Sequence, residues 1–239
     1  MSKLLYLFPR FSRLDLTLWG ASVLLILLSF FLFSASGPLT LTASLLGVTS
    51  LIYCAKGYPF GQVLMLVFSV LYGILSYSAA YYGEMLTYLG MTAPMAAFSL
   101  VSWVRNPSQG NRAQVAVAQL HPREAWLLPL LTVAVTVLFY YVLRAFDTAQ
   151  LAVSTLSVAT SFVAAYLTFR RSPYYALAYA ANDLVLVVLW ALAARNDPSS
   201  LSVLLCFAIF LVNDLYGFVS WKRMQRQQSA AVALASENS

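Results

Sequence analysis

Apolar residues run along the chain in eight long stretches, and short segments between them carry most of the charged residues. Each stretch is about as long as a helix must be to cross ~30 Å of hydrocarbon. Only helices and closed barrels satisfy every backbone polar group in lipid. The pattern therefore predicts an all-α, polytopic membrane protein with eight transmembrane helices, near Leu18–Ser36, Leu39–Ala55, Phe60–Tyr82, Met85–Val104, Ala125–Ala145, Thr148–Thr168, Pro173–Ala194 and Leu201–Trp221.

Polar residues recur at helical spacing on one face of two of these stretches. The third contains Gln62 and Tyr72 on one stripe, and the fourth contains Thr92 and Ser99 near Pro94. Proline removes a helix hydrogen bond, so we expect a kink there. Such a stripe has two interpretations: it packs helices together, or it lines the path of a polar solute, because Gln and Tyr are costly to turn toward lipid.

The seventh and eighth stretches each hold an Asn-Asp pair near mid-membrane, Asn182-Asp183 and Asn213-Asp214, with no Lys or Arg in either stretch. An ionisable residue at that depth is a functional hypothesis by default. Carboxylates and amides beside aromatic rings suit a cation or a polyhydroxylated ring. Neighbouring helical residues point about 100° apart, so one member of each pair is enough to face a solute. The other then has a structural explanation, as a protonated or capped residue between helices. The candidate binding residues are Gln62, Tyr72, Thr92, Ser99, Tyr179, Asn182, Asp183, Trp190, Asn213 and Asp214.

Composition and charge agree with a membrane protein. The 239 residues are 61% hydrophobic and 9% charged, against about 25% charged in soluble domains. Twelve of the fourteen Lys and Arg fall on one side of the predicted membrane, and only Arg144 and Arg195 fall on the other. By the positive-inside rule both termini are cytoplasmic. The net charge of +6 then reflects topology, and no nucleic-acid partner is expected.

A weak internal repeat relates two triplets of helices. Ser102-Trp103-Val104-Arg105 closes the fourth stretch and Ser220-Trp221-Lys222-Arg223 closes the eighth, 118 positions later. Stretches 2–4 thus match stretches 6–8 in the same orientation, which predicts two parallel three-helix bundles joined by a connector helix, plus an extra N-terminal helix. Trp103 and Trp221 also fit an interfacial aromatic belt. The predicted units are 1–37 (N-terminus and extra helix), 38–105 (first bundle), 106–147 (loop and connector), 148–226 (second bundle) and 227–239 (disordered tail).

Other readings of the chain find less support. The first stretch and the Ser34-Ala35-Ser36 that ends it resemble a signal peptide, but removing that stretch would scatter the basic residues over both faces. Cys54 and Cys206 lie inside apolar stretches, so neither a disulfide nor a metal site is indicated. No nucleophile–base pair, metal cluster or phosphate loop occurs, and His121 stands alone in a loop. We therefore expect neither an enzyme nor a cofactor.

Three short motifs resemble the PnuC family of bacterial vitamin B3 transporters. They are Tyr58-Pro59-Phe60-Gly61, Tyr82-Gly83-Glu84-Met85-Leu86 and the ending Asp214-Leu215-Tyr216-Gly217-Phe218-Val219-Ser220-Trp221. The resemblance covers about residues 39–225. It implies nicotinamide riboside as the solute, facilitated movement without an ion gradient, and a fold similar in outline to the SWEET sugar transporters. It also implies a homotrimer in the bacterial inner membrane, and a cytoplasmic riboside kinase that traps the solute by phosphorylation.

The chain departs from that family at identifiable positions. Ala96 and Ser99 stand where members have Asn and Gly, Phe98 where they have Tyr, and Tyr175 where Trp is common. Asn182 fits the family's intramembrane Asn. The polar load here therefore shifts toward the seventh and eighth stretches.

The residues also suit this solute chemically. Aromatic rings attract a pyridinium cation, with Tyr179, Trp190 and Tyr72 as candidates. Amides can pair with the carboxamide, and a carboxylate can accept two hydroxyl groups. A phosphorylated solute would need Lys or Arg, so the mononucleotide is expected to be a poor substrate. Rival hypotheses are a carrier for thiamine or a deoxynucleoside, and a proton-coupled symporter that uses Asp183 or Asp214.

Overall fold

In the computed structural model, residues 11–33, 37–78 and 81–237 are described. Lys3, Arg10 and the signal-like Ser34-Ala35-Ser36 lie outside these residues, as do positions 79–80 and 238–239. The described residues form helices joined by short connections. These are α1 (Arg13–Leu32), α2 (Pro38–Ala55), α3 (Phe60–Ser78), α4 (Tyr82–Thr87), the π-helix η2 (Tyr88–Thr92), α5 (Ala93–Arg105), α6 (Pro122–Ala145), α7 (Leu151–Phe169), α8 (Tyr175–Ala194) and α9 (Ser200–Glu237).

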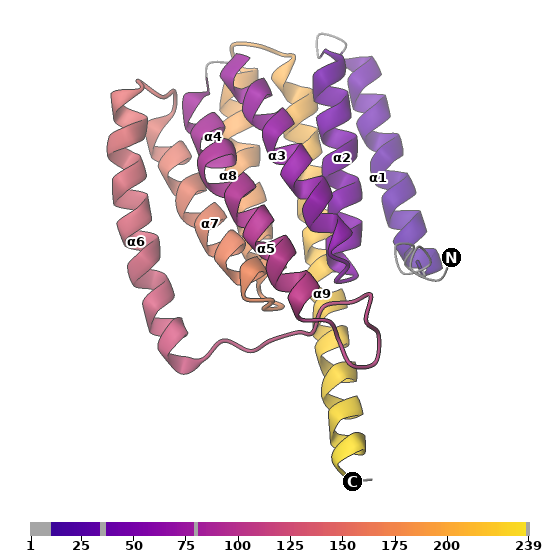
Figure 1. The fold of residues 1–239 in the computed structure, drawn as a ribbon. Coiled ribbons are helices and arrows are strands. Elements are labelled where there is room, and N and C mark those ends of the chain that lie inside the picture. Colours follow the sequence, from indigo (N-terminus) through magenta and orange to yellow (C-terminus); the bar gives the residue numbers. More distant parts are fainter. Residues whose placement is uncertain (1–10, 34–36, 79–80, 238–239) are drawn as a thin grey trace.

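Eight helical segments of the described chain are long and apolar enough to span a membrane, as the hydrophobic pattern predicts. The fourth is a composite, because α4, η2 and α5 follow one another without a break from Tyr82 to Arg105. The segments stand side by side, with α1 at one edge of the bundle and α6 at the other (Figure 1). The described chain begins and ends at the same end of the bundle (Figure 1).

The edge helix α6 is the least buried of the spans, with 6% of its apolar window inside the protein. It packs mainly against α7. Its start is well defined in the sequence: His121 caps the helix through Nδ1, which accepts a hydrogen bond from the Arg123 amide, and Glu124 completes a capping box. The lone histidine therefore has a structural role, and the rest of α6 presents apolar side chains to lipid or to a partner.

The last helix is longer than the sequence pattern indicates. A disordered tail is predicted from residue 227, but α9 continues to Glu237 and projects beyond the other helices (Figure 1). The segment after Arg226 contains no Gly or Pro and is rich in Gln and Ala, which favour a helix once preceding turns are formed. Low apolar content in this segment shows only that it is not buried.

A polar loop, residues 106–121, crosses the end of the bundle where the chain terminates. The Val115 amide donates to the Gly57 carbonyl (2.9 Å) in the α2–α3 turn, and the Ala118 amide donates to the Arg171 carbonyl (3.0 Å) in the α7–α8 turn. Both turn residues have positive φ, 70° at Gly57 and 58° at Arg171. The loop thus joins the α2–α3 and α7–α8 turns, in each case through a backbone hydrogen bond to a carbonyl of a residue with positive φ.

Two tryptophans connect helices rather than facing the membrane surface. The Trp103 Nε1 at the end of α5 donates to the Thr168 carbonyl of α7 (2.9 Å), and the Trp221 Nε1 in α9 donates to the Cys54 carbonyl of α2 (2.8 Å). Their rings lie 5.3 Å apart, and each side chain is almost fully buried. The interfacial-belt interpretation is wrong for both. Position near a span end cannot distinguish a ring in the headgroups from one between helices.

Candidate functional site

Asp183 of α8 and Asp214 of α9 lie side by side inside the bundle. Each is 4% exposed, and the two carboxyl groups are close enough to interact with each other. The second oxygen of Asp183, Oδ2, has no hydrogen-bond partner among the described residues. The described ion pairs, Lys56–Asp15 and Arg170–Glu124, involve neither residue. The two predicted acids therefore meet, and no basic side chain compensates them.

Aromatic rings form the second part of the site. The Trp190 Nε1 of α8 donates to the Tyr72 hydroxyl of α3 (2.8 Å), and both side chains are 2% exposed. The Tyr72 ring stacks on Phe68 and meets Phe207 edge to face. The predicted residues Tyr72 and Trp190 thus come together across the bundle, although they lie 118 positions apart in the sequence.

Tyr179 and Gln62 lie near the Asp pair. The charges of Asp183 and Asp214 both act on the Tyr179 hydroxyl. The Gln62 Nε2 donates to the Cys54 sulfur (3.3 Å), and Cys54 in turn lies close enough to Asp214 to interact with it electrostatically. These contacts place hydrogen-bonding groups from α2, α3 and α8 around the α9 carboxyl.

The two predicted asparagines have different surroundings. The Asn182 Oδ1 accepts hydrogen bonds from Thr160 (2.8 Å) and Ser161 (3.0 Å), both on α7. The Asn213 Nδ2 donates to Ser22 of α1 (2.9 Å) and to the Ile209 carbonyl. Asn182 keeps its amide nitrogen for another partner. Asn213 uses its amide nitrogen for α1 and its own helix, and its Oδ1 has no hydrogen-bond partner among the described residues.

Thr92 and Ser99 lie in the composite fourth span. Both side chains are buried, at 4% and 1% exposure, and Thr92 donates within its own helix to the Thr87 carbonyl (3.3 Å). The predicted distortion at Pro94 takes the form of the π-helix immediately before it. Single π-turns inside α-helices are frequent at functional sites.

Sequence reasoning missed three residues of this region. Tyr88 lies on η2 with its ring centroid 4.3 Å from that of Tyr72. Tyr81 lies 5.1 Å from Trp190, and burial together with the nearby Asp197 carboxylate raises the pKa of Tyr81, which keeps its hydroxyl neutral. Glu84 is fully buried at the start of α4. For Tyr88 the π-helix explains the miss, because it shifts the register by which a 3.6-residue period assigns faces.

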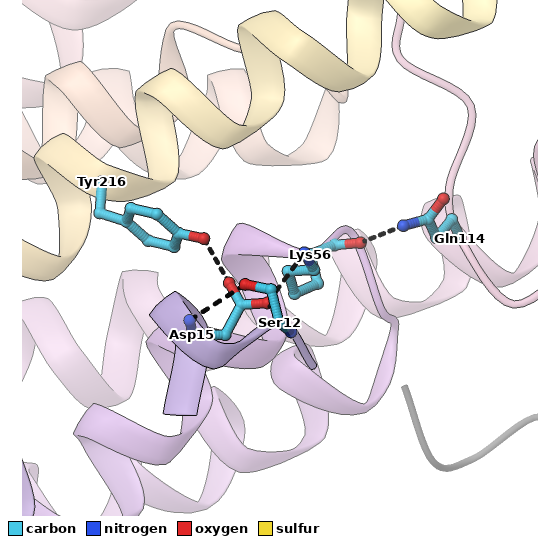
Figure 2. Close-up of polar contacts among 5 residues, drawn as sticks. All are labelled: Ser12, Asp15, Lys56, Gln114 and Tyr216. Atoms are coloured by element: carbon cyan, nitrogen blue, oxygen red, sulfur yellow. Dashed lines mark hydrogen bonds and ion pairs between the residues drawn. The ribbon is translucent and has the colours of Figure 1, made fainter. Parts of the chain in front are cut away.

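A further acid that the sequence analysis did not single out, Asp15, anchors α1. Its Oδ2 lies 3.0 Å from the Lys56 Nζ and accepts the Ser12 amide, while the Tyr216 hydroxyl donates to Oδ1 (Figure 2). Gln114 in the loop donates to the Lys56 carbonyl (3.1 Å). This cluster, Ser12, Asp15, Lys56, Gln114 and Tyr216, joins α1, the α2–α3 turn, the loop and α9. Every charge in it is compensated.

A buried acid pair, aromatic rings and eight spans characterise this protein, and its sequence matches a known family. A family model described as nicotinamide mononucleotide transporter matches residues 37–223. The chain belongs to this family. The match confirms the resemblance to PnuC proteins that the three motifs indicate, and the family and the eight apolar helices make the chain a multi-pass inner-membrane protein.

Two relatives of this family member are named nicotinamide riboside transporter PnuC. The one from Neisseria mucosa is 25% identical over 203 residues, which cover 83% of this chain and 77% of the relative. The one from Haemophilus influenzae is 21% identical over 190 residues, covering 79% and 81%. A crystal structure of the vitamin B3 transporter PnuC superposes with a TM-score of 0.82 at 22% identity, covering 93% of this chain and 96% of that one. The fold is therefore shared along nearly the whole chain.

Proposed function

We propose that the protein is a carrier, not an enzyme, that moves nicotinamide riboside into the cell by facilitated diffusion. The observation that supports this proposal most directly is the pair Asp183 and Asp214. The two acids are buried together beside aromatic rings, and neither takes part in an ion pair of the described residues. A desolvated carboxyl in this setting gains most from a cation or from hydroxyl donors, and the riboside supplies a pyridinium ring and ribose hydroxyls. The names of the two relatives support this choice.

The residues divide the recognition between them. Trp190 and Tyr179 flank the ring with Tyr72 as a third aromatic contact. The free amide nitrogen of Asn182 pairs with the carboxamide or ribose, together with Gln62. Asp183 or Asp214 accepts the hydroxyls or balances the cation. Thr92 and Ser99 line the opposite wall. The Asn213 Oδ1, which has no hydrogen-bond partner among the described residues, is a second candidate for the carboxamide or ribose.

The proposal extends to the architecture. Residues 38–105 and 148–226 form two parallel three-helix bundles with a SWEET-like outline, joined by a connector within 106–147, and residues 1–37 add the extra helix. The matched contacts Trp103–Thr168 and Trp221–Cys54 support this repeat. Both termini are cytoplasmic, the protein is a homotrimer, and a cytoplasmic riboside kinase traps the solute.

The riboside and not the mononucleotide is the proposed solute. The family description names the mononucleotide, but a phosphate needs Arg or Lys, and α8 contains neither while α9 has them only from Lys222 onward. Uptake into protein-containing liposomes should be fast for labelled riboside and at least tenfold slower for labelled mononucleotide. Trp190→Ala and Asn182→Ala should each reduce riboside uptake. Equal rates for the two solutes contradict the proposal, as does full activity of both variants.

A proton-coupled symporter is the second candidate, favoured by the close approach of the buried Asp183 and Asp214 carboxyls. Two carboxyls that share a site disfavour the doubly ionised form, so such a pair suits the uptake of a proton. Liposomes with an imposed proton gradient distinguish the mechanisms. A facilitator takes up riboside only to equilibrium and ignores a protonophore, whereas a symporter concentrates the riboside until the protonophore is added.

A further inference from the structure

Glu84 is a buried acid that the proposed binding site does not use. It lies in the first turn of α4 at the end of the bundle away from the chain termini (Figure 1). Its side chain is fully buried, and neither Oε1 nor Oε2 has a hydrogen-bond partner among the described residues. An isolated buried carboxyl is one of the costliest groups a protein can hold. Its retention needs an explanation.

Tight packing places Glu84 against α7. The preceding residue, Gly83, has no room for a side chain, because an added Cβ would lie 2.8 Å from the Thr148 Cγ2. This close approach brings the Glu84 carboxyl beside the Ser157 hydroxyl of α7. The Ser157 hydroxyl is fully buried and is also unpartnered within the described chain. The two polar groups are adjacent, and no other described residue satisfies either of them.

Glu84 is also linked to the aromatic part of the proposed site. It lies one helical turn before Tyr88, the first residue of the π-helix. The Tyr88 ring lies 4.3 Å from that of Tyr72, centroid to centroid, and Tyr72 accepts the indole hydrogen bond of Trp190. Tyr88 therefore connects Glu84 to the aromatic rings of the site.

Among the described residues, no basic group forms an ion pair with Glu84. The ion pairs of the described chain involve Asp15 and Glu124 only, and Arg144 and Arg195, the basic residues at this end, are exposed. A buried carboxylate is stabilised by an opposite charge within about 4–6 Å. The cation that fits has to come with the solute.

We propose that Glu84 is a specificity-determining residue that favours a solute with a cationic ring over the same solute with a neutral ring. This inference rests on the proposed function, since it concerns how that site selects its solute. The Tyr72 and Tyr88 rings present electron-rich faces to the ring. A cationic ring bound there favours the ionised form of the Glu84 carboxyl behind them, which a neutral ring does not. Ser157 completes the pocket as a neutral hydrogen-bonding group.

The test compares two solutes that differ in charge and hardly in shape: nicotinamide riboside and its 1,4-dihydro form, whose ring is neutral. Binding to the detergent-purified full chain and uptake into liposomes are measured for both. The wild type should prefer the cationic form. Glu84→Gln, which keeps size and hydrogen-bonding capacity, should reduce that preference about tenfold, corresponding to ~1.4 kcal/mol. Glu84→Asp keeps the charge and should keep the preference.

Ser157→Ala is the matched control, because it alters the same pocket without changing charge. It should affect both solutes by the same factor. Melting temperature and monodispersity of each variant establish that the protein is folded. An unchanged preference in Glu84→Gln overturns the inference while leaving the proposed function intact. A wild type that binds neither form overturns the proposed function itself. An equal loss of preference in Ser157→Ala also contradicts the role of charge.

Discussion

Buried acids occur in two regions of this protein, and they differ in what surrounds them. At the end where the chain terminates, the Asp15 carboxyl is paired with Lys56 and bonded to Ser12 and Tyr216 (Figure 2). In the interior, Glu84, Asp183 and Asp214 have no basic partner, and three of their oxygens accept no hydrogen bond from a described residue. In the first region the carboxyl is compensated by the protein itself. In the second region the carboxyls are left to be compensated by a ligand.

The contrast separates stability from function in physical terms. Removing a charge from water is costly, and partners such as those of Asp15 offset that cost within the folded protein. The interior acids lack this compensation, so they lower the free energy of unfolding of the empty protein. Binding of a complementary solute raises that free energy again. Charge changes in the two regions should therefore have opposite consequences.

The largest expected effect is at Asp183. Asp183→Asn removes the charge and keeps the shape, so riboside uptake into liposomes should fall on the order of a hundredfold, about what loss of one partner of a buried charge contact costs. The melting temperature of the empty protein should stay the same or rise, because an uncompensated acid has gone. A variant that transports normally, or one that melts far below the wild type, would put Asp183 in the structural class with Asp15.

An intermediate effect of the opposite kind is expected at Asp15. Asp15→Asn leaves Lys56 and the Tyr216 hydroxyl without their acceptor, so the free energy of unfolding should fall by about 1–3 kcal/mol. Riboside affinity should stay within twofold of the wild type. Thermal unfolding and binding in detergent measure the two quantities. The double variant Asp15→Asn with Lys56→Gln should recover part of the stability, since no unpaired charge remains; a loss of affinity at unchanged stability would contradict this account.

The smallest effect is expected at Asn213. Its amide nitrogen bonds Ser22 of α1 and only its Oδ1 is left for the solute, so Asn213→Ala should change riboside affinity less than twofold. Asn182→Ala, the matched change at the equivalent position of the other Asn-Asp pair, should weaken binding several-fold. Titration of the purified variants with riboside gives both numbers. Equal losses would give Asn213 the same weight in binding as Asn182.

Much of the fold follows from the sequence because hydrophobicity determines which segments enter the membrane. The eight spans agree with that reasoning. What a single sequence does not contain is the identity of each neighbour. The pattern predicts Trp103 at the membrane interface, but its indole donates to the Thr168 carbonyl. Nothing in the sequence indicates that the Asn213 amide nitrogen donates to Ser22 of α1.

Glu84 shows a second reason why part of the site escapes pattern analysis. It lies at the edge of a span, where an acid is ordinarily solvated, and only the tight contact of Gly83 with α7 buries it. The π-helix then turns Tyr88 toward Tyr72 against the expected period. Both features depend on backbone geometry that residue types alone do not specify.

The hydrogen bonds of Trp103 and Trp221 constrain how the helices they join can move apart. The Trp103 indole of α5 donates to a carbonyl of α7, and the Trp221 indole of α9 donates to a carbonyl of α2. The two rings pack against each other. A motion that separates both helix pairs at this end therefore has to break two buried hydrogen bonds, one at each tryptophan.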